Sequence, residues 1–228
     1  MYDSAGHYYS TYELRHHGIL GQKWGVRRFQ NKDGTLTSAG KKRIHKVNEF
    51  AYKPPKGDKW SERDYAQLQK YVNDMETVYN KLSHKEKFYV SSRRNDDEYS
   101  TLDGYKRKLE SKSKYEHAPL KGSKIIYNSS GDPIGYFDAH KDYANEIKFD
   151  IAIVPEERGK GYYRQLCAQI PKIVKQHPEV NYFEWPVHKN NTASIAIAEK
   201  LNGFERTSGM KGSFICYTLK KDRKGFKA

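Results

Sequence analysis

The stretch IAIVPEERGKGYYRQL, residues 151–166, decides how this chain folds. Its first residues alternate as a strand, a basic glycine-rich turn follows, and a helix pattern begins at once. The backbone N–H groups of residues 159–163 should therefore point outward at the positive end of the helix dipole. Two glycines permit close approach and unusual dihedral angles, and two basic side chains add charge. Such a turn is an anion cradle suited to a pyrophosphate. The residues concerned are Arg158, Gly159, Lys160 and Gly161.

Strand and helix patterns alternate around this turn. Upstream, the turn NSSGD (128–132) joins two strand-like segments into a hairpin, and a longer strand covers 145–155. Downstream, Pro171 predicts a kink in the helix, a strand covers 180–187, and an Asn-capped helix and two final strands follow. This order predicts an α/β fold with a mixed central sheet.

Helical segments precede the hairpin. An apolar stripe of helical spacing predicts an amphipathic helix over 61–82, with Ser61 as its N-cap. A short helix is expected at 84–90, and a polar, helix-containing loop at 95–117.

The composition divides the chain into parts. It has 228 residues, a net charge of +14 and a mean hydropathy of −1.00, which is too polar for one compact globule. Residues 1–60 carry 12 basic and 5 acidic residues, lack apolar periodicity and end in the breaker-rich KPPKGDK. We expect a weakly ordered basic arm and linker over 1–60, a folded domain over 61–220 and a basic tail over 221–228.

Several classes of protein are not expected. No apolar run is long enough to cross a bilayer, and the N-terminus lacks the basic and apolar regions of a secretory signal. Cys167 and Cys216 form neither a disulfide framework nor a metal-ligand spacing. The basic residues of the domain are scattered singly, so nucleic acid is not expected as the main ligand. We expect a reduced, cytoplasmic protein without a metal site.

Two sequence blocks resemble the GNAT superfamily of acyl-CoA-dependent N-acetyltransferases. The first is the run Arg158 to Tyr163, which matches the family signature Q/R-x-x-G-x-G/A after the fourth strand. The second is NTASIAIAEKLNGF, with Asn191, Ser194 and a helix that closes at Gly-Phe. The resemblance covers about residues 61–220 and is best over 122–220. It implies a GNAT-type sheet whose fourth and fifth strands, 145–154 and 180–187, splay apart.

The resemblance also implies acetyl-CoA as the cofactor and transfer of its acetyl group to an amine. The pantetheine arm would pair with the backbone of the fourth strand, the pyrophosphate would lie on the turn, and the second block would touch the cofactor. The implied cofactor-binding residues are Ile151, Ala152, Ile153, Arg158, Gly159, Lys160, Gly161, Tyr162, Tyr163, Asn191 and Ser194.

The chain departs from the family pattern at two positions. Tyr163 stands where the signature has Gly or Ala, and Ala198 stands where the family often has a tyrosine that protonates the leaving thiolate. These departures motivate the alternative of a catalytically inactive GNAT fold that serves as a structural or binding protein.

A proton acceptor is still needed, because the attacking amine must be neutral. The candidate general bases are Glu146 and Asp150 on the fourth strand and Glu184 on the fifth. Glu184, beside Trp185, is slightly favoured, and His188 is a weaker proton carrier.

The arm carries a second resemblance. Residues 13–43, ELRHHGILGQKWGVRRFQNKDGTLTSAGKKR, resemble an N-terminal segment of tailed-phage and prophage proteins encoded near head-morphogenesis genes. That segment precedes unrelated domains, which suggests docking rather than chemistry. We therefore expect a phage-encoded protein of the host cytoplasm that docks onto a capsid or head protein and becomes virion-associated. The aromatic and basic residues expected to dock are Trp24, Arg27, Arg28 and Phe29.

Overall fold

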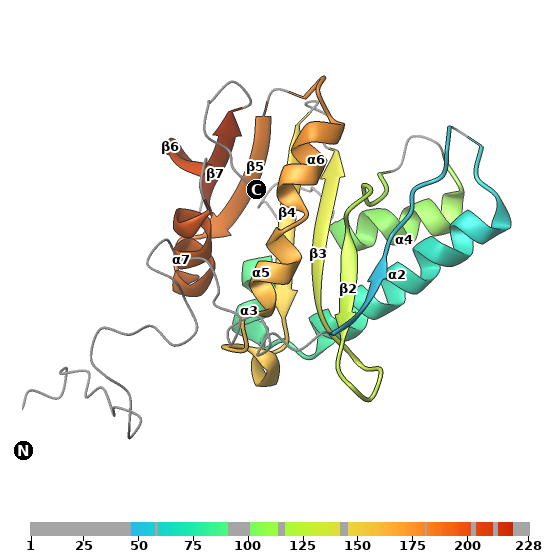
Figure 1. The fold of residues 1–228 in the computed structure, drawn as a ribbon, viewed down its shortest axis with the longest axis horizontal. Coiled ribbons are helices and arrows are strands. Elements are labelled where there is room, and N and C mark those ends of the chain that lie inside the picture. Colours follow the sequence, from blue (N-terminus) through green and yellow to red (C-terminus); the bar gives the residue numbers. More distant parts are fainter. Residues whose placement is uncertain are drawn as a thin grey trace, which may run out of the picture. The chain divides into compact units, whose positions relative to one another are not determined.

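A computed structural model describes residues 47–57, 59–90, 101–113, 117–141, 146–180, 182–201, 204–211 and 214–220 (Figure 1). All of them belong to one compact unit that begins at Lys46. Its elements, in chain order, are β1 (Asn48–Ala51), α2 (Glu62–Asn80), α3 (His84–Val90), α4 (Thr101–Ser111), β2 (Lys124–Tyr127), β3 (Pro133–Lys141), β4 (Ile147–Ile153), a short 3₁₀ helix (Pro155–Glu157), α5 (Tyr162–Cys167), α6 (Ile170–Gln176), β5 (Tyr182–His188), α7 (Thr192–Lys200), β6 (Phe204–Lys211) and β7 (Phe214–Lys220).

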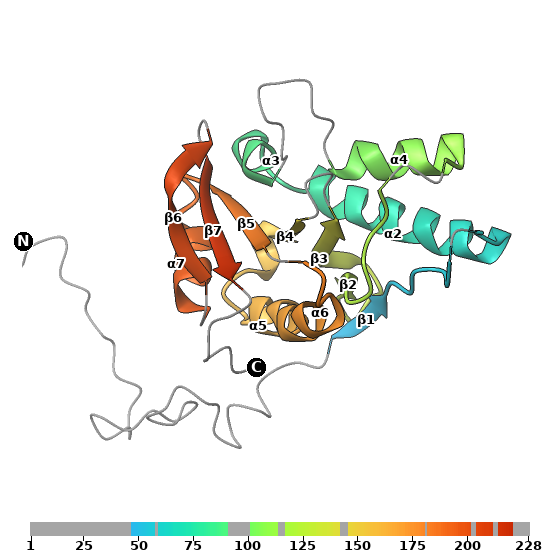
Figure 2. The same ribbon diagram turned by 90° about the horizontal axis from the view of Figure 1, so that it is seen from above.

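The strands form one mixed sheet, in the order β1-β2-β3-β4-β5-β7-β6. Only β4 and β5 are parallel among the described strands, and every other neighbouring pair is antiparallel. Helices α2, α3 and α4 cover one face of the sheet, and α5 and α6 cover the other (Figure 2). This arrangement confirms the predicted α/β fold with a mixed sheet of GNAT type.

The two faces of the sheet bury different side chains. On the face away from α2, the rings of Phe137, Phe149 and Phe183 stack across three strands at centroid distances of 5.7 and 6.2 Å. On the α2 face, alternation along β3 brings Tyr136 and Asp138 into the interior. One face is therefore an ordinary aromatic core, and the other buries polar groups.

The parallel pair β4 and β5 is joined only where the two strands begin. Their register runs over Ile147↔Phe183 and Lys148↔Glu184, although β4 continues to Ile153 and β5 to His188. The strands therefore part toward their carboxyl ends, as the resemblance implied. We call this divergence of the two backbones, between residues 149–153 of β4 and 185–188 of β5, the notch.

The sheet begins earlier than the sequence pattern indicated. Asn48–Ala51, which the pattern placed in the arm and linker, pair with β2 as an edge strand, and Tyr52 is buried with its N–H donating to Ser123 C=O at 2.9 Å. A strand of four residues is too short for its alternation of apolar and polar residues to be distinguished from a basic linker in the sequence. Trimming of the arm should therefore stop near Lys46 rather than near residue 60.

The helix predicted after the glycine-rich turn is divided in two. Helix α5 ends at Cys167, and Pro171 lies in the first turn of α6, where its missing N–H removes no helical hydrogen bond. The helices predicted at 61–82 and 84–90 are confirmed as α2 and α3, and 95–117 contains α4. Ser61 caps α2 in a reciprocal capping box with Asp64.

Candidate active site

Asp150 lies on β4 at the inner edge of the notch, on the face covered by α2 and α4. Its two carboxylate oxygens have different donors: the Ile151 N–H reaches Oδ1 at 2.8 Å, and the Tyr136 hydroxyl reaches Oδ2 at 3.2 Å. Burial, and then the negative charge of Asp138, raise the pKa of the Asp150 carboxyl to about 7. A carboxyl group with this pKa is well matched to accepting a proton near neutral pH.

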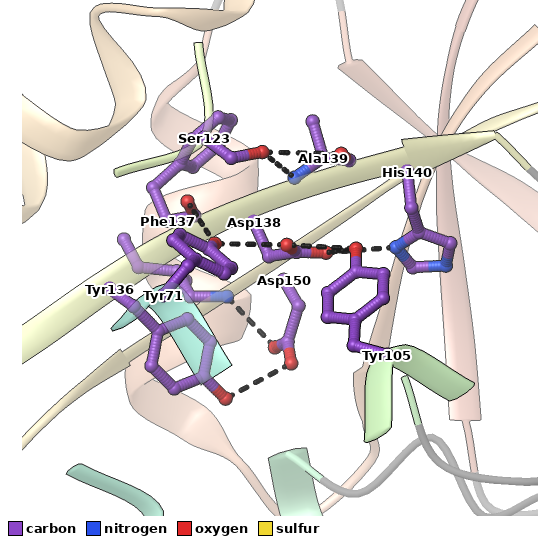
Figure 3. Close-up of polar contacts among 10 residues, drawn as sticks. Tyr71, Tyr105, Ser123, Tyr136, Phe137, Asp138, Ala139, His140 and Asp150 are labelled. Carbon is purple, nitrogen blue, oxygen red and sulfur yellow. Dashed lines mark hydrogen bonds and ion pairs between the residues drawn. The ribbon is translucent and has the colours of Figure 1, made fainter. Parts of the chain in front are cut away.

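Asp138 faces Asp150 directly across the β3–β4 register and is fully buried. The Tyr71 hydroxyl donates to its Oδ1 at 2.9 Å, the Tyr105 hydroxyl lies 3.0 Å from both oxygens, and His140 Nδ1 lies 2.9 Å from Oδ2 (Figure 3). Burial raises the pKa of both phenols well above their ordinary range, and the charge of Asp138 raises it further, so both remain protonated donors. The carboxylate is thus held by side chains from α2, α4 and its own strand.

The backbone around this cluster is also fixed by a side chain. Ser123 Oγ accepts from the Ala139 N–H at 2.9 Å and lies 3.2 Å from the Ala139 carbonyl oxygen (Figure 3). The strand is therefore pinned beside Asp138.

A cavity of about 160 Å³ opens onto Asp150 and Tyr136. Residues of α2, α3 and α4 form the rest of its wall, and Lys106 of α4 pairs with Glu76 of α2 there. The cavity is thus a polar chamber with a carboxylate of raised pKa in its wall. Its lining consists of Met75, Glu76, Tyr79, Asn80, Val90, Thr101, Leu102, Asp103, Lys106, Tyr136 and Asp150.

The other carboxylates proposed from the sequence lie elsewhere. Glu184 of β5 is buried beside its register partner Lys148 and is not among the residues that line the cavity. Glu146 precedes β4, at the end where β4 and β5 are joined. The structure brings Asp150 alone of the three candidates to the cavity wall.

His188 ends β5 on the same face. Its ring stacks on that of Tyr89 from α3 at 4.7 Å, and its Nδ1 accepts from the Asn190 N–H at 3.2 Å. Burial, helped by the charge of Lys189, lowers the pKa of His188. The ring is therefore neutral at neutral pH.

The glycine-rich turn has the predicted backbone. Gly159 and Gly161 adopt left-handed φ angles of 75° and 84°, and a Cβ at either position would meet no atom within 4 Å. The first hydrogen bond onto α5 runs from the Arg164 N–H to the Gly161 carbonyl at 3.1 Å. The N–H groups of residues 159–163 precede it and are not used by the helix ladder.

The basic side chains of the turn have partners within the protein. Arg158 Nε donates to the Ile153 carbonyl at 2.9 Å, and its guanidinium pairs with Glu86 of α3. Lys160 pairs with Glu157 at 2.7 Å. The turn therefore offers an anion its backbone N–H groups, while its cations contact neighbouring carboxylates.

Two predicted contacts on β4 also have partners. The Ile151 N–H is bonded by Asp150 and the Ile153 carbonyl by Arg158, whereas Ala152 is the register partner of Tyr136 on β3. The two outward-facing backbone groups of the notch are therefore held by side chains that could rotate away.

The aromatic residues after the turn pack inward. Tyr162 is buried, and Tyr163 packs against the core with its hydroxyl accepting from Arg164 Nε at 3.2 Å. The ring of Tyr163 is thus directed to the Arg164 side chain and the core.

The second sequence block forms the start of α7. Asn191 is its N-cap, and its Oδ1 accepts from the Ser194 N–H at 3.2 Å. Ala198, where the family often has tyrosine, is completely buried. In this block Asn191 therefore serves as the N-cap of α7. Because residue 198 is alanine, α7 has no hydroxyl at that position.

The residues expected to dock, Trp24, Arg27, Arg28 and Phe29, lie outside the described residues. Within the described part of the chain, no three metal-ligating side chains come together. None of the described helices combines the length and the apolar character that crossing a membrane requires.

The polar cluster around Asp138 was not predicted. Its signal was present in β3, where Tyr136, Asp138 and His140 alternate on one face of an otherwise apolar strand. An acidic residue between Phe137 and Ala139 in a central strand indicates a buried charge that needs donors. The phenol donors come from α2 and α4, which are distant in sequence, so no local pattern in β3 predicts them.

Comparison with known proteins adds the family. The family model described as "Acetyltransferase (GNAT) domain" matches residues 58–205. The chain belongs to the GNAT acetyltransferase family. Solved structures are similar to parts of the chain, whereas no curated protein matches it.

Three of these solved structures illustrate the identity, TM-score and coverage of the matches. The PaiA N-acetyltransferase from Thermoplasma acidophilum, in complex with coenzyme A, is 17% identical, with a TM-score of 0.43, and the match covers 68% of this chain and 94% of that one. For the GNAT domain of S. lividans PAT the identity is 12%, the TM-score 0.49 and the coverage 66% and 85%. For the ribosomal-protein-S18-alanine N-acetyltransferase from Escherichia coli they are 15%, 0.41, and 78% and 96%.

Proposed function

We propose that this GNAT protein transfers an acetyl group from acetyl-CoA to an amine that enters the cavity at Asp150. The observation that carries the proposal is the position of Asp150, a carboxylate of raised pKa at the edge of the β4–β5 notch in the wall of a cavity. Acetyl-CoA supplies a thioester whose acetyl carbon is open to attack by a neutral amine.

The turn and the notch fit such a cofactor. Left-handed Gly159 and Gly161 leave open space where a Cβ would stand, and the N–H groups of residues 159–163 are available to a pyrophosphate. Ile151 and Ile153 would offer backbone groups to the pantetheine arm once Asp150 and Arg158 turn away. Asn191 and Ser194 would border the cofactor from α7.

Asp150 has the role of general base. Its deprotonated carboxylate takes a proton from the ammonium form of the acceptor, so that the nitrogen lone pair becomes free to attack. The Ile151 N–H would be freed when the Asp150 carboxylate turns away from it, and it could then donate to the carbonyl oxygen of the thioester. Tyr136 keeps the carboxylate oriented toward the cavity through its hydroxyl.

Two measurements test this function. Titration calorimetry with acetyl-CoA should show saturable binding, and an amine panel should then release free thiol. Absence of binding at millimolar cofactor would refute the proposal. Binding without thiol release would instead support the alternative, an inactive GNAT fold that serves as a binding or head-associated protein, which Ala198 and Tyr163 motivate.

The arm is proposed to have a separate role. The likeness of residues 13–43 to segments of phage proteins supports docking onto a phage capsid or head protein through Trp24, Arg27, Arg28 and Phe29. Heads co-expressed with the full chain should retain it, and a chain lacking residues 1–45 should be lost, because the compact unit begins at Lys46. Equal recovery of the two chains would refute the docking role.

A further inference from the structure

Two acidic residues lie side by side in the interior, and they are held in different ways. Asp138 and Asp150 are opposite each other in the β3–β4 register and project from the same face of the sheet. Side chains directly opposite across antiparallel strands have Cβ atoms about 5 Å apart. The Asp138 carboxylate has hydrogen bonds to the side chains of Tyr71, Tyr105 and His140. The Asp150 carboxylate accepts hydrogen bonds from one phenol, that of Tyr136, and from one backbone N–H.

This asymmetry gives the two carboxyl groups different surroundings. Donors to an acidic side chain stabilise the ionised form, and two carboxylates at this distance cannot both ionise freely. Asp138 has more hydrogen-bond partners than Asp150, and its charge is one of the causes that raise the pKa of the Asp150 carboxyl. Asp150 borders the cavity, so it is the member that can exchange a proton with a ligand.

We propose that Asp138 is a positioning residue that acts through Asp150: its buried negative charge keeps the Asp150 carboxylate basic enough to deprotonate an amine in the cavity. The proposal rests on the proposed function for its catalytic meaning, but the coupling of the two carboxyl groups is a property of the folded chain. Without Asp138, the Asp150 carboxyl would be a stronger acid and therefore a weaker base.

Other charged and titratable groups also face Asp150, and their charges can also change how its carboxyl titrates. Among them, Lys106 is paired with Glu76, and Lys148 of β4 is the register partner of Glu184 of β5. Helix α3 contributes the apolar Val90 to the cavity. By element, the facing groups are Tyr136, Asp138 and His140 of β3, Glu76 and Tyr79 of α2, Asp103 and Lys106 of α4, Lys148 of β4 and Glu184 of β5.

The test is Asp138→Asn, which keeps the side-chain shape and removes the charge. We expect the acidic limb of the kcat/KM profile to move to lower pH by about one to two units. The ¹³C-carboxyl NMR titration of Asp150, assigned with Asp150→Asn, should move by the same amount in the same direction. A merely structural role would lower activity and leave both midpoints in place, and that result would overturn the proposal.

A matched control is Asp74→Asn. Asp74 on α2 also accepts a hydrogen bond from a tyrosine, Tyr127 at 2.6 Å, but it does not line the cavity. This variant should leave both midpoints unchanged. An equal shift in the control would show that loss of an acidic side chain changes the titration nonspecifically, and would also overturn the proposal.

Two provisions keep the test decisive. If Asp138→Asn does not fold, Tyr105→Phe removes one donor and should shift the Asp150 titration in the same direction by a smaller amount, and no shift would count against the proposal. If the protein transfers acetyl to no amine, the proposed function fails, and the NMR titration alone still decides whether Asp138 controls Asp150.

Discussion

The turn at 158–163 is formed mainly by backbone groups, whereas the cavity at Asp150 is formed by side chains. The turn depends on backbone: left-handed Gly159 and Gly161 expose N–H groups, while Arg158 and Lys160 are paired with carboxylates. The cavity depends on side chains that five separate elements bring together. A site made of backbone tolerates changes in side-chain chemistry, whereas a site made of side chains changes its chemistry with each of them.

The largest effect should come from the cavity. Asp150→Asn removes the proton acceptor and should lower kcat/KM by about 10²-fold or more, with the dissociation constant of acetyl-CoA changed little. Steady-state kinetics and calorimetry on the same preparation measure both quantities. A comparable loss of cofactor affinity would mean that the two regions are not separable.

The pH dependence should follow from the same residue. Because the deprotonated form of Asp150 is required and its pKa is about 7, kcat/KM should rise with pH through about 7 and fall about tenfold for each unit below it. Asp150→Asn should lose this limb.

Stability should change with pH in the opposite sense. Between its ordinary value of 3.8 and about 7, the folded state binds a proton at Asp150 that the unfolded state has released. This contribution is therefore present below the unfolded value and is lost as pH rises through about 7. Urea unfolding across this window should show a smaller decline for Asp150→Asn than for the wild type.

A backbone change should affect the turn alone. Gly161→Ala places a Cβ at a φ of 84° on the face that we propose for the pyrophosphate, and acetyl-CoA affinity should fall by about tenfold. The matched control is Gly131→Ala, since Gly131 has a φ of 87° in the hairpin turn, also with open space around it. Both variants should lose similar stability, and only the first should lose affinity.

The smallest effect should come from the link between α3 and the turn. Burial by itself raises the pKa of Glu86, but hydrogen bonds from Arg158 and Ser83 lower it to about 2, so the pair is fully charged at neutral pH. Glu86→Gln frees Arg158 and should tighten acetyl-CoA binding by about two- to threefold, within the range of partly exposed ion pairs. Weaker binding would show that Glu86 holds Arg158 in its binding position.

These contrasts also explain what could be predicted from the sequence. The turn was predictable because strand, glycines and helix are contiguous in residues 151–166, and the left-handed angles of Gly159 and Gly161 follow from residue type. Asp150 could be proposed only as one of three carboxylates, because its distinction from Glu184 depends on burial and on Asp138. The Asp138 cluster and the edge strand β1 depend on partners remote in sequence, and no periodicity encodes those contacts.

The placement of Asp138 opposite Asp150 has a consequence for how this chain can vary in length. A slip of one residue between β3 and β4 would turn an acidic side chain onto the phenylalanine face, where no donors meet it, so insertions within β3 should be rejected. The sheet already contains a register shift between Ile126 and Tyr127, next to the hairpin turn. Insertions and deletions in the hairpin can be absorbed at that irregularity, which leaves the pairing of the two carboxyl groups insulated from changes in the loop.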